Sequence, residues 1–232
     1  MRRPLSTVVT LLLSLTVVPY LPACSETDST NVKTSGLWAH LTIVQSGDGD
    51  VSAEAAVRVG GSTGTELNMV SGEHLEVNGA TMTGYQNIFN QHWYAATIPP
   101  DPDGLYNIVF MRVDEQVSTT LTMPLAPYTN DGTTVHTDNQ VTFFWDDPET
   151  GGDVQVTVDG SCIETQVLTV DSSAGELTTE PIADASMIPQ DCPFAISISR
   201  HVQGDVNPAY QAGRTEATRH SSESMYFIST LQ

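Results

Sequence analysis

The chain has 232 residues, and it carries 8 Lys and Arg against 28 Asp and Glu, which gives a formal net charge of −20 at pH 7. This charge repels nucleic-acid phosphates and argues against nucleic acid as a partner. Attraction to cations or to basic partners stays open, beside the simpler interpretation of a solvated acidic surface.

The first residues have the parts of an export signal. Arg2 and Arg3 precede an apolar run over residues 5–18, and Pro19 and Pro22 follow it. A membrane-spanning helix needs about 20 apolar residues, so this run is too short to span. The prolines also end a helix early, because proline lacks the amide donor. Cleavage of the segment is therefore the better interpretation.

Residues 21–24, Leu-Pro-Ala-Cys, resemble the lipobox of bacterial lipoproteins. The resemblance implies that residues 1–23 are a signal peptide and that Cys24 becomes the lipidated first residue, anchored in a bacterial cell envelope. Ser25 after the cysteine implies the outer membrane under enterobacteria-like sorting. The alternative is simple secretion with a free or paired Cys24.

The odd number of cysteines supports lipidation of Cys24. An exported chain with three cysteines has one left over, and lipidation of Cys24 leaves Cys162 and Cys192 to form a disulfide. We interpret that bridge as structural, because the two cysteines lack the Cys-x-x-Cys spacing of redox-active pairs.

Residues 24–36 are polar and without apolar periodicity, which predicts a flexible tether. From Leu37 the pattern becomes that of short strands, since Leu37, Ala39, Leu41 and Ile43 alternate with less apolar residues. Similar runs recur between Gly, Asp and Pro clusters, as all-β sandwiches require. They are AEAAVRV, TELNMV, HWYAATI, LYNIVFM and STTLTM.

Two prolines and several turn formers gather in residues 123–132, which predicts a boundary between two domains, 37–124 and 125–232. A weak internal repeat supports the division, because five residues recur at identical spacing in each half. They are Asp103, Tyr106, Ile108, Phe110 and Arg112 in the first half, and Asp191, Phe194, Ile196, Ile198 and Arg200 in the second.

The stretch PDGLYNIVF resembles the turn and penultimate strand of bacterial immunoglobulin-like domains. The resemblance implies an all-β fold of two tandem immunoglobulin-like sandwiches, with Gly104 in the turn and the Tyr106 hydroxyl bonded back to it. The second half departs from antibody domains, because its order is Trp145, Cys162, Cys192 rather than Cys, Trp, Cys.

Gly60–Gly64, GGSTG, satisfies the Gly-x-Ser-x-Gly expression of serine hydrolases. That motif needs a helix after the serine, whereas the residues after Ser62 read as another strand. No histidine stands in a recognisable triad setting. We therefore expect a Gly-rich hairpin here.

Zinc is not expected, because no two histidines stand at ligand spacing. Calcium is the open alternative, and no other cofactor is expected. Its best location is the loop with Asp146, Asp147, Glu149 and Asp153, although Asp also serves tight turns without an ion.

Rings at Trp38, Trp93 and Phe144 could face outward and stack on a sugar or a protein, or could cover a seam or core. No set of nucleophile, base and orienting residue emerges. The sequence thus predicts a non-enzymatic binding or structural module, held on the envelope through the lipid on Cys24, with an envelope protein or glycan as its partner. The alternative is a secreted hydrolase acting on glycans through an acidic cleft.

Overall fold

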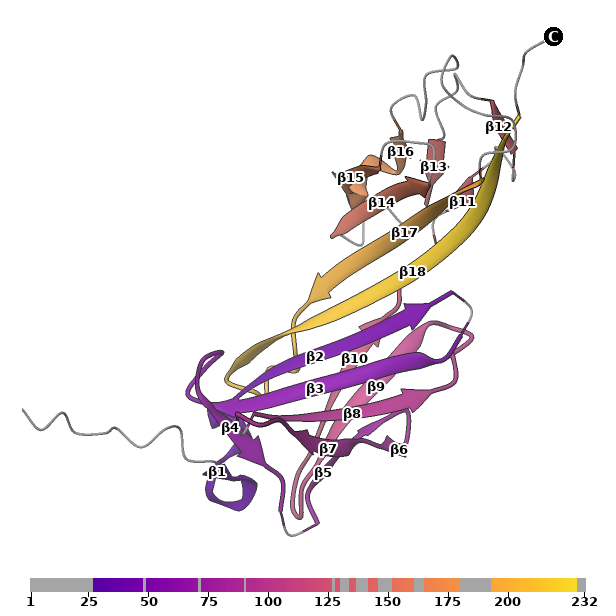
Figure 1. The fold of residues 1–232 in the computed structure, drawn as a ribbon. Coiled ribbons are helices and arrows are strands. Elements are labelled where there is room, and N and C mark those ends of the chain that lie inside the picture. Colours follow the sequence, from indigo (N-terminus) through magenta and orange to yellow (C-terminus); the bar gives the residue numbers. More distant parts are fainter. Residues whose placement is uncertain are drawn as a thin grey trace, which may run out of the picture.

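A computed structural model describes residues 27–47, 49–70, 72–89, 91–126, 128–129, 134–136, 142–145, 152–160, 165–179 and 193–228. The regular elements in these ranges are strands and single-turn 3-10 helices (Figure 1). The prediction of an all-β, immunoglobulin-like fold is confirmed. No helix in the described ranges combines the length and hydropathy that a membrane span requires.

The first sandwich has one sheet in the order β2–β3–β8–β7. Neighbouring strands of this sheet are antiparallel. Immunoglobulin domains have a similar antiparallel sheet, which includes the domain's first strand. The predicted alternation of the first strand is confirmed, because every second side chain from Leu37 to Ile43 is fully buried. The strands are β2 (Leu37–Ser46), β3 (Val51–Val59), β7 (Thr83–Gln86) and β8 (His92–Ile98).

The opposite sheet has the order β10–β9–β5–β6. Apolar side chains from both sheets meet in one core, in which Leu41 and Ile43 of the first sheet and Ile108 and Phe110 of the second are fully buried or nearly so. The strands are β5 (His74–Val77), β6 (Ala80–Thr81), β9 (Leu105–Met111) and β10 (Gln116–Thr122).

A buried tyrosine fixes the turn before β9, as the resemblance implies. Tyr106 is fully buried, and its hydroxyl accepts a hydrogen bond of 3.0 Å from the Asp101 amide. Gly104 lies in the turn at φ +66°, a conformation that glycine adopts without steric strain. This arrangement is the tyrosine corner of immunoglobulin-like domains.

Replacing Tyr106 with phenylalanine should therefore lower the free energy of unfolding by about 1 kcal/mol, since one hydrogen bond is lost and the ring remains. Urea unfolding measures the difference. The matched control is Tyr85→Phe on exposed β7, which should leave stability within about 0.5 kcal/mol of the parent. Equal values for the two variants would show that the corner adds no stability.

The second sandwich is built in the same way from the later strands. One sheet contains β15–β14–β17–β18, and the other contains β11–β13–β16. Phe143 and Trp145 are buried between them. The elements are β11 (Tyr128–Thr129), β12 (Thr134–His136), β13 (Thr142–Phe144), β14 (Asp153–Gly160), β15 (Gln166–Asp171), η4 (Ser172–Ala174), β16 (Glu176–Thr178), β17 (Pro193–Gly204) and β18 (Ala212–Ile228).

Strand β18 joins the two sandwiches (Figure 1). Its first half pairs in parallel with β2 from Trp38 to Ser46, and it pairs with β17 from Thr215 to Tyr226. Ala217 of β18 and Tyr210 of the loop before it belong to the core of the first sandwich. One 11-stranded sheet thus runs through both sandwiches. The division at residues 124 and 125 stays a prediction.

The segment before β2 is packed against the first sandwich. It contains β1 (Thr27–Asp28), which pairs in parallel with β4 (Thr65–Asn68), and the short helices η1 (Ser29–Asn31) and η2 (Thr34–Gly36). Ser29 and Thr34 are buried, and the Ser29 hydroxyl accepts a hydrogen bond from the Val70 amide. Residues 27–36 thus differ from the flexible tether that their composition predicts, because their polar groups bond to the sandwich.

Candidate functional site

A groove of about 1010 Å³ opens at the end of the first sandwich where β9 turns into β10. Four parts of the chain far apart in the sequence form it: residues 30–35, Glu73, the turn at 112–115, and the loop before β18. Its wall contains both apolar and charged side chains. The lining residues are Thr30, Asn31, Val32, Lys33, Thr34, Ser35, Glu73, Arg112, Val113, Asp114, Glu115, Pro208 and Ala209.

Arg112 connects the N-terminal segment to Glu73. Its Nε donates to Glu73 Oε1 at 2.9 Å, its Nη1 donates to Thr34 Oγ1 at 3.1 Å, and its Nη2 donates to the Ser29 carbonyl at 2.7 Å. The guanidinium carbon also lies 5.4 Å from the centroid of the Phe110 ring. Because the guanidinium presents donors in a fixed planar fork, it can bind three acceptors that lysine could not reach together.

Glu73 is the least satisfied group of the groove. The residue is only 8% exposed, and its Oε2 has no hydrogen-bond partner among the residues that the structure describes. A buried carboxylate oxygen without a donor loses its hydration without replacement. Glu73 Oε2 is therefore an acceptor that the described residues leave without a donor.

Glu115, one of the two acids at the turn, faces the N-terminal segment. Glu115 accepts a hydrogen bond from the Thr34 hydroxyl, and its carbonyl accepts one from the Arg112 amide. Burial raises the pKa of the nearby Tyr210 hydroxyl far above its ordinary value, and the negative charge of Glu115 raises it further. The Tyr210 hydroxyl is therefore neutral at physiological pH.

His74 lies next to Glu73 but points elsewhere. Its Nε2 lies 2.9 Å from Glu76 Oε1, and its Nδ1 lies 3.0 Å from the Gly72 carbonyl. The hydrogen bond to Glu76 raises the pKa of His74, as does the one to Gly72.

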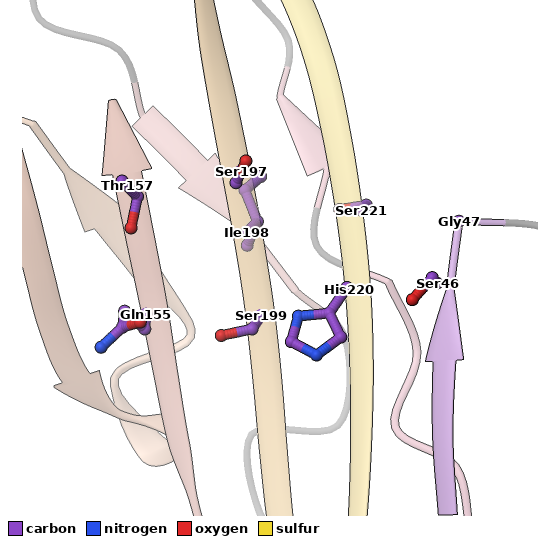
Figure 2. Close-up of a pocket in the computed structure, with 9 residues that line it drawn as sticks. All are labelled: Ser46, Gly47, Gln155, Thr157, Ser197, Ile198, Ser199, His220 and Ser221. Atoms are coloured by element: carbon purple, nitrogen blue, oxygen red, sulfur yellow. The ribbon is translucent and has the colours of Figure 1, made fainter. Parts of the chain in front are cut away.

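A second, smaller hollow of about 430 Å³ lies on the sheet that joins the sandwiches. Figure 2 shows Gln155, Ser199, His220 and Ser46 on four neighbouring strands, and the strand registers place these residues in one row. The row offers hydroxyl, amide and imidazole groups but no carboxylate or permanent cation. The groove, which has both, is the stronger candidate for a binding site.

The predicted anchor and disulfide lie outside the described residues. This holds for residues 1–23, Cys24, Cys162 and Cys192, and for Asp146, Asp147 and Glu149 of the predicted calcium loop. All stay predictions. Asp153 is described and exposed, and it faces Asp171 and His201 across the sheet. Among the described residues, no three His, Cys, Asp or Glu side chains are grouped as metal ligands.

Ser62 lies in a hairpin between β3 and β4, as expected, and its carbonyl accepts a hydrogen bond from Arg58. The three aromatic candidates have partners. The Arg58 guanidinium lies 5.5 Å from the Trp38 ring centroid, and Trp93 stacks on Tyr85 at 5.7 Å. Phe144 is half-buried in β13.

The groove was not predicted from the sequence, because its residues come from four separate parts of the chain. One signal could have indicated it. Arg112 directly follows β9, whose inward positions are apolar, and a cation at such a place needs buried acceptors.

No protein-family model matches the chain, and no curated protein sequence matches it. The central fibronectin-III array of RIM-binding protein matches 88% of this chain and 72% of that structure, at 11% identity and a TM-score of 0.29. The match to the adhesin InvE of Yersinia pseudotuberculosis covers 83% of this chain and 60% of the adhesin structure, at 10% identity and a TM-score of 0.25. The match to the tandem immunoglobulin repeats of Dlar covers 83% of this chain and 97% of that structure, at 11% identity and a TM-score of 0.23. Likenesses this low carry no inference about function.

Proposed function

We propose that the protein is a non-enzymatic binding module, held on a bacterial envelope by lipid on Cys24, whose groove binds a cationic group of an envelope partner. The lipobox-like residues 21–24 support the anchor. The groove supports the binding role, because it combines acidic side chains with apolar walls at Val32, Val113 and Pro208.

One observation carries the proposal: the buried Oε2 of Glu73 has no hydrogen-bond donor among the described residues. A lysine or arginine side chain supplies an N–H donor together with a positive charge, and charge-assisted hydrogen bonds are stronger than neutral ones. The aliphatic stem of either side chain would lie against the apolar walls.

The same groove gives little support to a glycan hydrolase. Hydrolysis needs a carboxylate pair free to exchange protons across the scissile bond. Glu73 is instead ion-paired with Arg112, and Glu115 accepts a hydrogen bond from Thr34.

The test is thermal unfolding of residues 25–232 with agmatine and with a lysine-containing tripeptide. A ligand at 100 times its dissociation constant should add about 2.7 kcal/mol to the folded state. Glu73→Gln should reduce this shift, measured against the variant's own melting temperature. Glu76→Gln is the control, because Glu76 is on β5, the strand that begins directly after Glu73, and does not line the groove.

No shift with either ligand, or equal shifts in both variants, would contradict the role of Glu73. The anchor is tested separately by mass spectrometry of Cys24 in the membrane fraction. Lipid mass on Cys24, and release of the chain by Cys24→Ala, are the expected results.

A further inference from the structure

The turn between β7 and β8 presents two large apolar side chains to solvent. Ile88 is 91% exposed and Phe89 is 77% exposed. Asn87 fixes the turn, because its Oδ1 accepts hydrogen bonds from the amides of Phe89 at 2.9 Å and Gln91 at 3.0 Å, and its Nδ2 donates to Gln91 Oε1 at 2.7 Å. These bonds hold Asn87, Phe89 and Gln91 relative to one another while Ile88 and Phe89 remain exposed.

Two aromatic rings stand directly behind the tip. Tyr85 and Trp93 are opposite each other on β7 and β8, and their rings are stacked with centroids 5.7 Å apart. Tyr85 is 48% exposed. In a membrane interface, apolar side chains lie deepest and the amphipathic Tyr and Trp rings lie at the headgroup level. The hairpin has the same arrangement, with Ile88 and Phe89 at its end and Tyr85 and Trp93 behind them.

The hairpin also lacks formal charge. Residues 77–100 contain no Asp, Glu, Lys or Arg, in a chain that has 28 acidic residues. Entry of the tip into a lipid interface therefore buries no formally charged side chain, and the hairpin adds no repulsion from anionic headgroups.

The tip is at the same end of the molecule as the start of the described chain. The His92 amide donates to the Glu66 carboxylate, and the next residue along β4, Leu67, pairs with Thr27 of β1. Figure 1 shows β1, β4 and the β7–β8 hairpin together, on the side away from the second sandwich. Three residues from Cys24 to Thr27 span at most about 11 Å.

From these observations we propose that the β7–β8 tip inserts Ile88 and Phe89 into the membrane interface, beside the lipid on Cys24. The proposal rests on the lipid anchor of the proposed function. An anchor within 11 Å of β1 keeps this end of the sandwich near the bilayer. The bilayer is therefore the apolar partner that the tip meets at high local concentration.

The test places a tryptophan at the tip of the full-length, lipidated chain. Phe89→Trp and the control Val167→Trp are each reconstituted into phosphatidylcholine vesicles with brominated acyl chains, which quench tryptophan fluorescence on contact. Val167 is 59% exposed on β15 of the second sandwich. We expect loss of the added fluorescence of Phe89→Trp, whereas Val167→Trp keeps its added fluorescence.

Flotation of the same vesicles separates the two proposals. A chain that floats with the vesicles, while Phe89→Trp remains unquenched, overturns the insertion and leaves the anchor intact. A chain that does not float overturns the anchor and the insertion with it. Equal melting temperatures of both variants and the parent, measured in detergent, show that the tryptophans leave the fold unchanged.

Discussion

Replacing Arg112 with alanine is expected to lower the free energy of unfolding by about 3–5 kcal/mol, because it leaves the buried Glu73 carboxylate without its cation. The side chains of Arg112 and Glu73 are 11% and 4% exposed. The Ser29 carbonyl and the Thr34 hydroxyl lose donors as well. Denaturant unfolding of residues 25–232 measures the loss.

Arg214→Ala is the matched control. Arg214 also pairs with a glutamate, since its Nε lies 3.0 Å from Glu216 Oε1, but its side chain is 54% exposed. Water screens such a pair, so this variant should change stability by about 1 kcal/mol or less. A loss for Arg112→Ala no larger than that of the control would show that the groove network is not a structural element.

A double variant distinguishes the effect of the unpaired charge from the effect of the lost side-chain volume. Exchanging both partners, Arg112→Met with Glu73→Leu, leaves no unpaired buried charge, so it should destabilise less than Arg112→Ala alone. It should also abolish the agmatine shift, since the proposed acceptor is gone. A stable double variant that still binds agmatine would remove Glu73 from the proposed site.

The sequence predicted the strands well where burial alternates. In β2 and β10, one side chain in two points into a core, so the apolar pattern has the period of a strand. The tyrosine corner was also predictable, because Gly104 and Tyr106 are local to one turn. Elements whose signals lie within about ten residues were therefore accessible from the sequence.

The packing of residues 27–36 could not be predicted in this way. Their composition is that of a linker, and they are held by backbone pairing to β4 and by Arg112, which is far along the chain. Polar residues that bond to a distant partner have no local periodicity. The groove escaped prediction for the same reason.

The internal repeat has a physical counterpart. Ile108 and Phe110 of β9 are buried, as are Ile196 and Ile198 of β17, and each pair precedes a buried arginine. Arg112 bonds to the N-terminal segment, whereas Arg200 donates to the Ser172 hydroxyl at 3.1 Å. Arg112 directly follows β9 and Arg200 lies within β17, and each bonds to a neighbouring segment of its own sandwich.

Replacing Gly213 with alanine should disrupt the strand that joins the two sandwiches. A Cβ at this position would lie 2.1 Å from the Ala39 carbonyl oxygen and 2.9 Å from Val206 Cγ2. The first contact is with backbone, so β18 would have to move away from β2, where Gly213 and Ala39 are paired. Overpacking of this kind destabilises by about 1–3 kcal/mol, and we expect the upper part of that range.

Hydrogen exchange of Gly213→Ala shows which strands lose stability. Because β18 supplies Ala217 to the first core and also pairs with β17, exchange should quicken in β2 and β17 together. Gly36→Ala is the control, since its Cβ would meet only Val32 Cγ1 at an ordinary 3.5 Å. Faster exchange confined to β17 would show that the first sandwich is closed without β18, and that the shared sheet does not couple the stabilities of the two sandwiches.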